Sequence, residues 1–184
     1  VRLQSYGMSL SESLSTYGVL TGMALPCILF PSAITNSVST MLLPTVAEIQ
    51  ALNHRQELTS LVRKVTYSCI FLGSICCVSL LCFGKWVGTI LFHSPMAGDY
   101  IITLAWMCPF LYTNNTLISM INGIGKTTLS FGINSSSLGI RIASVFLLIP
   151  AFGIEGYLWG LLASQVCIFL FCLAYLKYYL RKAA

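Results

Sequence analysis

Long apolar stretches without charged residues dominate this sequence. Four of them are free of charge over 20 or more positions: 13–47, 65–84, 100–125 and 156–176. A fifth stretch, 127–154, contains Arg141 as its one charged residue. About 20 apolar residues in a helix cover the hydrocarbon core of a bilayer, and a helix satisfies its own backbone hydrogen bonds in lipid. The pattern therefore predicts an all-α integral membrane protein.

Breaks in the apolar pattern predict five transmembrane helices. They are expected at about 17–47, 60–83, 98–122, 127–149 and 154–179. The first is longer than one crossing requires and contains Pro26, Pro31 and Pro44, so we expect it to be kinked. Pro109 predicts a kink in the third helix. The short segment from Trp86 to Phe92 is expected to lie at the membrane surface.

Composition supports this assignment. Hydrophobic residues make up 57% of the chain and charged residues 8%, whereas soluble proteins contain about 25% charged residues. The net charge of +5 is scattered between apolar segments rather than gathered into a patch, so no nucleic-acid partner is expected. We expect a single membrane domain over 1–184, surrounded by membrane lipids and forming an internal fragment of a longer protein.

Basic residues alternate between the expected loops. They are found after the first helix, after the third helix and in the tail: Arg55, Arg63, Lys64; Lys126; Lys177, Arg181 and Lys182. The positive-inside rule places these three regions on the cytoplasmic side. The first helix then enters from outside, and the C-terminal tail of this cell-membrane protein is cytoplasmic.

A polar stripe runs along the expected helix 127–149. At 100° per residue, Ser130, Asn134, Ser137 and Arg141 share one face, opposite Gly132, Ser136, Gly139 and Ala143. The small residues permit close helix packing. Arg141 needs a partner, because a charge in hydrocarbon costs at least ~2.5–3.5 kcal/mol. It either pairs structurally with carbonyls or Glu155, or faces a solvated cavity, where it would suit a phosphate.

Two other expected helices repeat this polar pattern. Ser32, Asn36 and Ser39 share a face of the first helix, and Asn115, Ser119 and Asn122 share a face of the third. Each face either lines the same cavity or joins helices by hydrogen bonds. Gln165 is expected to be structural. The pairs Gly18/Gly22 and Gly156/Gly160 have the spacing of helix-packing motifs.

Signals for catalysis, metals or cofactors are weak. Gly123–Thr127 resembles the end of a phosphate-binding loop, but Met120 occupies the position of the required first glycine. His54 and His93 lie in separate loops without metal-ligand spacing. The eight cysteines lie in or beside apolar stretches and are expected to be small hydrophobic residues. We therefore expect no enzyme, no cofactor and no metal site.

Longer blocks of sequence carry a family resemblance. The first is Tyr17–Glu48, YGVLTGMALPCILFPSAITNSVSTMLLPTVAE. It is accompanied by CPFLY at 108–112, GIGK at 123–126 and IPAFGIEGYLWGLLAS at 149–164. Through these blocks the chain resembles the stage V sporulation protein B family, which belongs to the multidrug/oligosaccharidyl-lipid/polysaccharide exporter superfamily.

The resemblance implies a MATE-like fold of two lobes around a central cavity, with this chain forming most of the second lobe. It implies a flippase that moves a lipid-linked saccharide of the polyprenyl pyrophosphate type, a cell-wall, peptidoglycan or spore-cortex precursor, by alternating access. The polar stripes would meet partners in the first lobe, outside this sequence. In that setting Arg141, Asn134 and Ser137 are expected to face the cavity and hold the pyrophosphate.

Other functions stay open. A drug/cation antiporter of the same superfamily commonly carries an acid inside the membrane, and no acid lies in the middle of an expected span here. A membrane-embedded glycosyl- or acyltransferase would need an acid or histidine near the bilayer surface, where His93 and Asp99 are the nearest pair. A non-transporting membrane scaffold is the third alternative.

Overall fold

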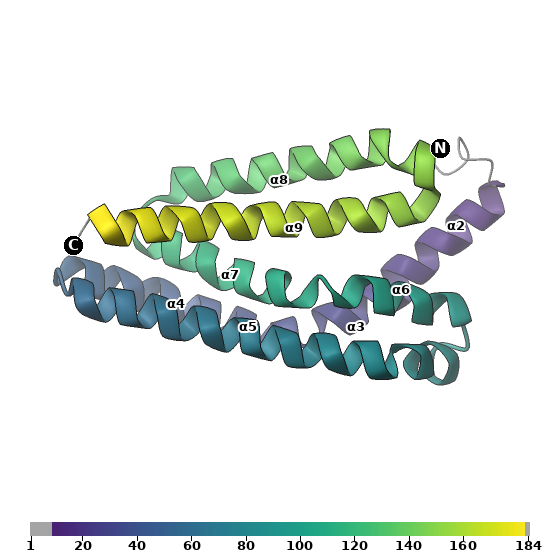
Figure 1. The fold of residues 1–184 in the computed structure, drawn as a ribbon, viewed down its shortest axis with the longest axis horizontal. Coiled ribbons are helices and arrows are strands. Elements are labelled where there is room, and N and C mark those ends of the chain that lie inside the picture. The colour runs from purple at the N-terminus through teal and green to yellow at the C-terminus, as the bar shows by residue number, and fades with distance from the viewer. Residues whose placement is uncertain (1–8, 183–184) are drawn as a thin grey trace.

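Helices account for all regular structure in the part of the chain that the computed structural model describes, residues 9–182. They lie side by side in an elongated bundle (Figure 1). In that view α8 and α9 form the upper side, α4 and α5 form the lower side, and α6 and α7 run between them. The prediction of an all-helical protein is confirmed.

The first helical region is bent, as its prolines predict. It comprises α2 (Leu10–Val19), the π-helical turn η1 (Leu20–Ala24), α3 (Leu25–Leu29) and α4 (Ser32–Ala51). The part up to Leu29 and the part from Ser32 meet at 57°, with Pro31 at the break. Proline lacks an amide hydrogen and clashes with the preceding turn, which accounts for the break.

Two hydrogen bonds satisfy carbonyl groups at this break. The hydroxyl of Tyr112 donates to the backbone oxygen of Ile28 over 2.7 Å, and the hydroxyl of Ser32 donates to that of Leu29 over 2.6 Å. Carbonyls at a helix end have no helical partner and are costly to leave unpaired in an apolar environment. The bend is therefore held by side chains as well as by Pro31.

The second region is one long helix. α5 (Arg55–Trp86) continues directly into the π-helical turn η2 (Val87–Leu91). The segment from Trp86 to Leu91 thus continues the same helix, and its expected position at the membrane surface stays a prediction. The chain turns back after this helix at His93, whose φ of 50° lies in the left-handed region.

The third region is broken near its proline, and the last two helices form a hairpin. α6 (Pro95–Ala105) and α7 (Cys108–Gly123) are separated at Trp106 and Met107, just before Pro109. α8 (Thr127–Leu147) then packs against α9 (Ile149–Lys182). Gly153 interrupts the start of α9 with φ 62° and ψ −140°, a conformation that favours glycine.

Fewer helices meet the length and hydropathy expected of a membrane span than the five predicted. Among the described residues, Arg55–Leu91 and Phe152–Arg181 do so, and the bent first region would be a third span. α6 and α7 are individually short, and α8 carries its polar stripe. The count of five spans therefore stays a prediction.

Buried side chains form two apolar clusters with a polar layer between them. One cluster contains Leu20, Ile28, Leu104, Tyr112 and Leu158, and the other Val46, Leu58, Leu117, Ile168 and Leu176. On α4, α5, α7 and α9, buried polar residues lie between the residues of the two clusters: Thr35, Ser39, Thr66, Thr113, Asn114, Thr116, Ser164 and Gln165. Most of the hydroxyl groups donate to carbonyls of their own helix. The side-chain amides of Asn114 and Gln165 instead form a hydrogen bond with each other, between α7 and α9.

Candidate functional site

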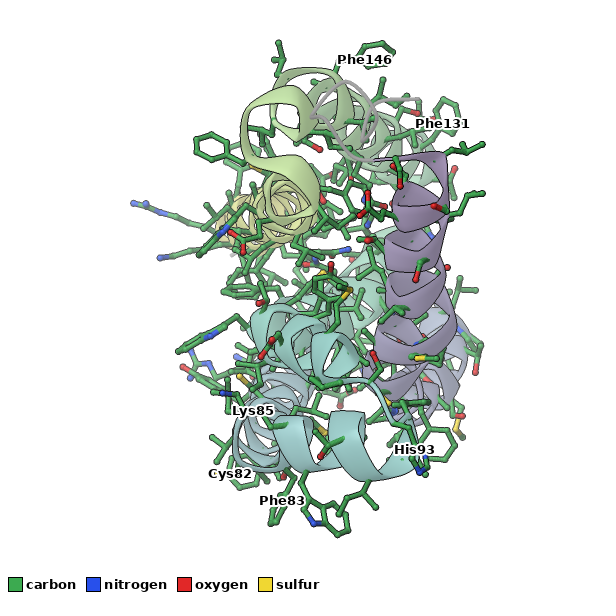
Figure 2. All side chains as sticks on the ribbon, turned by 90° about the vertical axis from the view of Figure 1, so that its right-hand side faces the viewer. Cys82, Phe83, Lys85, His93, Phe131 and Phe146 are labelled. Carbon is green, nitrogen blue, oxygen red and sulfur yellow. The ribbon has the colours of Figure 1, made fainter. Side chains whose placement is uncertain are left out.

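The polar stripe of α8 faces the bundle over most of its length. Ser130 and Ser137 are buried, Arg141 is half-buried and Asn134 is exposed. The opposite face is open: a Cβ added at Gly132 or Gly139 would meet nothing within 4 Å. Phe131 and Phe146 of α8 also point away from the bundle (Figure 2). Gly132 and Gly139 therefore make no close helix contact within the described chain.

A cavity of about 330 Å³ lies where α7, α8 and α9 meet. Its polar lining combines three candidates on α8, one candidate on α7 and two further amides: Asn134, Ser137, Arg141; Asn115; Asn114 and Gln165. Its apolar lining consists of Leu111, Ile118, Leu138 and Ile168. Residues from three separate predicted helices thus meet around one space, which we call the polar cavity.

Arg141 supplies the charge of the polar cavity. Its Nε donates to the hydroxyl of Ser164 on α9 over 3.3 Å, and that hydroxyl in turn donates to the backbone oxygen of Leu161. Within residues 9–182 no ion pair joins Arg141 to Glu155, and its terminal nitrogens have no hydrogen-bond partner. Ser164 therefore orients the guanidinium group while leaving its terminal edge open to a ligand.

Two buried amides next to Arg141 were not among the predicted cavity residues. Asn114 is 2% exposed, and its Nδ2 donates to both the backbone oxygen and the Oε1 of Gln165 at 2.9 and 2.7 Å. Its own Oδ1 has no donor within the described chain. The interhelical bond agrees with the structural role expected of Gln165, but both side chains also line the polar cavity. The sequence feature that could have indicated this part of the site is Gln165, the one side-chain amide in the apolar stretch 156–176.

The remaining candidates lie at different places. Asn36 on α4 accepts a hydrogen bond of 2.8 Å from Nδ2 of Asn115, so α4 is tied to the wall of the polar cavity. Ser119 and Asn122 on α7 are half-buried and do not line it. Ser130 is buried outside it, and its hydroxyl lacks a partner among residues 9–182. The structure thus groups five of the eight candidates: Arg141, Asn134, Ser137, Asn115 and, through Asn115, Asn36.

An apolar groove of about 600 Å³ adjoins the polar cavity between α8 and α9. It is lined mainly by apolar or small residues, among them Gly132, Ile133, Ile140 and Phe171, and Lys126 stands at the start of α8. Ser137 and Ile168 line both spaces. A polar and an apolar compartment therefore meet at the same two side chains.

The chemistry of the polar cavity favours binding rather than proton transfer. One guanidinium, four amides and one hydroxyl line it, and no described carboxylate or histidine does. Such groups bind phosphates and hydroxyl groups by hydrogen bonds. No group of three or more potential metal ligands is found in the described residues.

Comparisons with known proteins give one distant similarity. The chain is 23% identical over 164 residues to "Stage V sporulation protein B" of Bacillus subtilis (strain 168). The aligned region is 88% of this chain but 32% of that protein, so the chain spans about a third of the length of the curated relative it matches. No family model matches the chain, and no solved structure matches it. The relative bears the name of the family that the sequence blocks resemble.

Proposed function

We propose that this chain is part of a membrane transporter that moves a lipid-linked saccharide of the polyprenyl pyrophosphate type across the cell membrane by alternating access. The observation that carries the proposal is the junction of the polar cavity with the apolar groove at Ser137 and Ile168. A lipid-linked saccharide has one polar and one apolar part, and adjoining compartments of both kinds accommodate it. The name of the distant relative, a sporulation protein, agrees with a spore-cortex or cell-wall precursor.

Arg141 would bind the pyrophosphate. Its guanidinium is the one charged group lining the polar cavity among the described residues, and its terminal edge is unoccupied by other side chains. Arginine binds phosphate oxygens with paired hydrogen bonds, which are stronger than those between neutral groups. Ser164 holds the guanidinium at Nε, so the paired donors need little reorganisation on binding.

The amides around Arg141 would bind the saccharide. Asn114 has a buried Oδ1 without a donor, and Asn134 is exposed on the same side of α8. A buried carbonyl oxygen without a donor costs about 1–3 kcal/mol, which a hydroxyl group of a ligand or a water molecule relieves. Sugar hydroxyls both donate and accept hydrogen bonds and therefore suit a wall of amide groups.

The first lobe of the transporter, outside this sequence, would close the open side of the polar cavity. Asn134, which lines the polar cavity, and Asn36, which is bonded to the lining residue Asn115, are both exposed in this chain. Rocking of the two lobes would expose the polar cavity to each side of the membrane in turn, while the lipid tail stays in the apolar groove or the bilayer. In this arrangement the C-terminal tail is cytoplasmic.

A drug/cation antiporter is the second candidate. Such a transporter needs a site for a cation, and the polar cavity presents a fixed positive charge and no carboxylate among the described residues. A cation placed beside Arg141 would be repelled. The composition of this lining therefore favours an anionic substrate over a cationic drug.

The experiment is a transport assay with the full-length protein in proteoliposomes, using a fluorescent polyprenyl-pyrophosphoryl saccharide. Arg141→Ala is expected to reduce the initial rate about tenfold or more, because a hydrogen bond to a charged group contributes about 1.5–3 kcal/mol. Arg141→Lys retains the charge and should keep part of the rate. Gly139→Ala, on the open face of α8, is the matched control. Equal rates for Arg141→Ala and the control, at equal reconstituted amounts, would overturn the proposal.

A further inference from the structure

A separate pocket lies at the end of the bundle where α4 turns into α5 and where α9 ends. Its volume is about 730 Å³. It is lined by residues of all three helices: Gln50; Arg55, Gln56, Leu58, Thr59, Ser60, Arg63, Lys64; Tyr179 and Leu180. We call it the basic pocket. In Figure 1 this end also contains the α7–α8 turn and the C-terminus, far from the end at which η2 and the α8–α9 turn lie.

Among the described residues, the lining of the basic pocket has three positively charged side chains and no carboxylate. Arg55 and Arg63 are two helical turns apart on α5, and Lys64 follows directly. The acidic residues on the neighbouring segments, Glu48 on α4 and Glu57 on α5, are exposed and do not line it. Glu57 is instead paired with His54 over 3.2 Å. The described lining therefore has an excess of positive charge, led by Arg63 and Lys64, which favours an anion.

The other walls of the basic pocket are fixed by contacts between helices. Nε2 of Gln50 donates to the hydroxyl of Tyr179 over 2.8 Å, which joins α4 to α9. The ring of Tyr179 stacks on Tyr175, with ring centres 6.3 Å apart. Buried Leu58 and half-buried Leu180 add an apolar surface next to the charges. The pocket thus has a charged side and an apolar side.

The position of the pocket along α5 suits a membrane surface. The uncharged stretch 65–84 begins directly after Lys64, so the basic residues lie at the boundary between the polar start of α5 and its apolar part. Tyrosines are enriched at this depth of a membrane. Basic pockets between helices at the membrane surface bind the phosphate of acidic lipids.

We propose that the basic pocket is a binding site for the phosphate group of an anionic phospholipid. The phosphate contacts Arg55, Arg63 and Lys64, and the acyl chains leave over Leu58 and Leu180 toward the apolar surface of the bundle. This site is distinct from the polar cavity, which lies around Arg141 at the level of the buried polar layer. It therefore requires no assumption about the transported substrate.

The test is native mass spectrometry of the full-length protein in detergent, titrated with phosphatidylglycerol and, separately, with phosphatidylcholine. The variant Arg55→Gln/Arg63→Gln/Lys64→Gln removes the three charges of the pocket. Each basic residue near a membrane surface strengthens binding of acidic lipid about fivefold, so we expect the affinity for phosphatidylglycerol to fall about tenfold or more. The matched control, Lys85→Gln/Lys177→Gln/Arg181→Gln, removes the same charge from residues that do not line the pocket. It should bind phosphatidylglycerol as the wild type does.

Two further measurements identify the source of the phosphate and guard against misfolding. In the first, inorganic phosphate competes with the lipid. Displacement at millimolar phosphate would show that the pocket also binds free phosphate, whereas no displacement would show that it binds the phosphate only as part of a lipid headgroup. Arg55→Lys/Arg63→Lys keeps the charges and should retain most of the affinity, which a merely unfolded variant would not. Equal affinity of the pocket variant and the matched control, or no preference of the wild type for phosphatidylglycerol, would overturn the proposal.

Discussion

Helices α7 and α8 carry similar polar stripes but sit in different surroundings. α7 packs against α4, α5, α8 and α9, whereas α8 packs chiefly against α9 and only in part against α7. Two of the three side-chain amides of α7 are accordingly bonded within the chain, Asn114 to Gln165 and Asn115 to Asn36. On α8, Asn134 is exposed and, among residues 9–182, Arg141 has a hydrogen-bond partner only at Nε. The same polar pattern thus joins helices where they are enclosed and remains open to ligand or partner where they are not.

Glycines at the contacts between enclosed helices differ in the same way from the glycines of α8. A Cβ at Gly73 on α5 would lie 2.5 Å from Cα of Pro109 at the start of α7, and one at Gly160 on α9 would clash with the side chain of Ser144. At Gly132 and Gly139 on α8 there is open space. Glycine is therefore required at the contacts of the enclosed helices but not on the outer face of α8.

The largest effect should follow from filling an enclosed glycine. Gly73→Ala forces backbone of α5 and α7 apart, and overpacking of this kind costs about 1–3 kcal/mol. Gly132→Ala adds the same methyl group in open space and should change the free energy of unfolding by less than about 0.5 kcal/mol. The unfolding midpoints of the detergent-solubilised protein, followed by size-exclusion chromatography after heating, measure the difference. Similar midpoints for the two variants would mean that α5 and α7 are not in contact as described.

An intermediate effect should follow from removing the buried amide of α7. Asn114→Leu deprives Gln165 of its donor, and interhelical hydrogen bonds in membrane proteins contribute about 0.6 to 2 kcal/mol. Asn134→Leu on α8 breaks no bond within the described chain and should leave the unfolding midpoint unchanged while slowing transport. If Asn134→Leu destabilised the protein as much as Asn114→Leu, α8 would be as enclosed as α7, which would contradict the difference between the two helices.

The smallest effect should come from the exposed amide pair. Asn36→Ala and Asn115→Ala remove the two partners of one hydrogen bond between α4 and α7. A double-mutant cycle on the free energy of unfolding should give a coupling of about 0.6 kcal/mol, the average for such bonds in membrane proteins. A coupling of zero would indicate that the two amides are separated in the assembled protein and available to a ligand.

Local rules predicted much of the helical layout. Helical periodicity placed Arg141, Asn134 and Ser137 on one face, and all three line the polar cavity, while Pro31 and Pro109 mark breaks between helices. These features depend on residues close in sequence, for which geometry follows from the chain itself. The boundaries were less accurate, because α2 begins at Leu10 and α5 begins at Arg55, in polar sequence that a capping box or continuing helix can include.

Contacts between distant helices were beyond sequence reasoning. Gly18/Gly22 and Gly156/Gly160 have identical spacing, yet the first pair faces open space and the second contacts α8 and the turn that follows it. The pairing of Asn114 with Gln165 likewise depends on how α7 and α9 pack, not on either local pattern. Residue spacing shows which side chains share a face of a helix. Whether that face packs, binds or stays exposed depends on the neighbouring helix.

The most direct test of a solvated polar cavity is the water accessibility of the two faces of α8. In a functional full-length background lacking its native cysteines, Asn134→Cys and Gly139→Cys would be labelled in membranes with a charged, water-soluble thiol reagent. Such reagents attack the thiolate, which forms in water and is disfavoured in apolar surroundings. We expect Asn134→Cys to react about tenfold faster or more than Gly139→Cys and to be protected by the lipid-linked saccharide. Equal rates, or faster labelling of Gly139→Cys, would contradict a solvated polar cavity on the Arg141 side of α8.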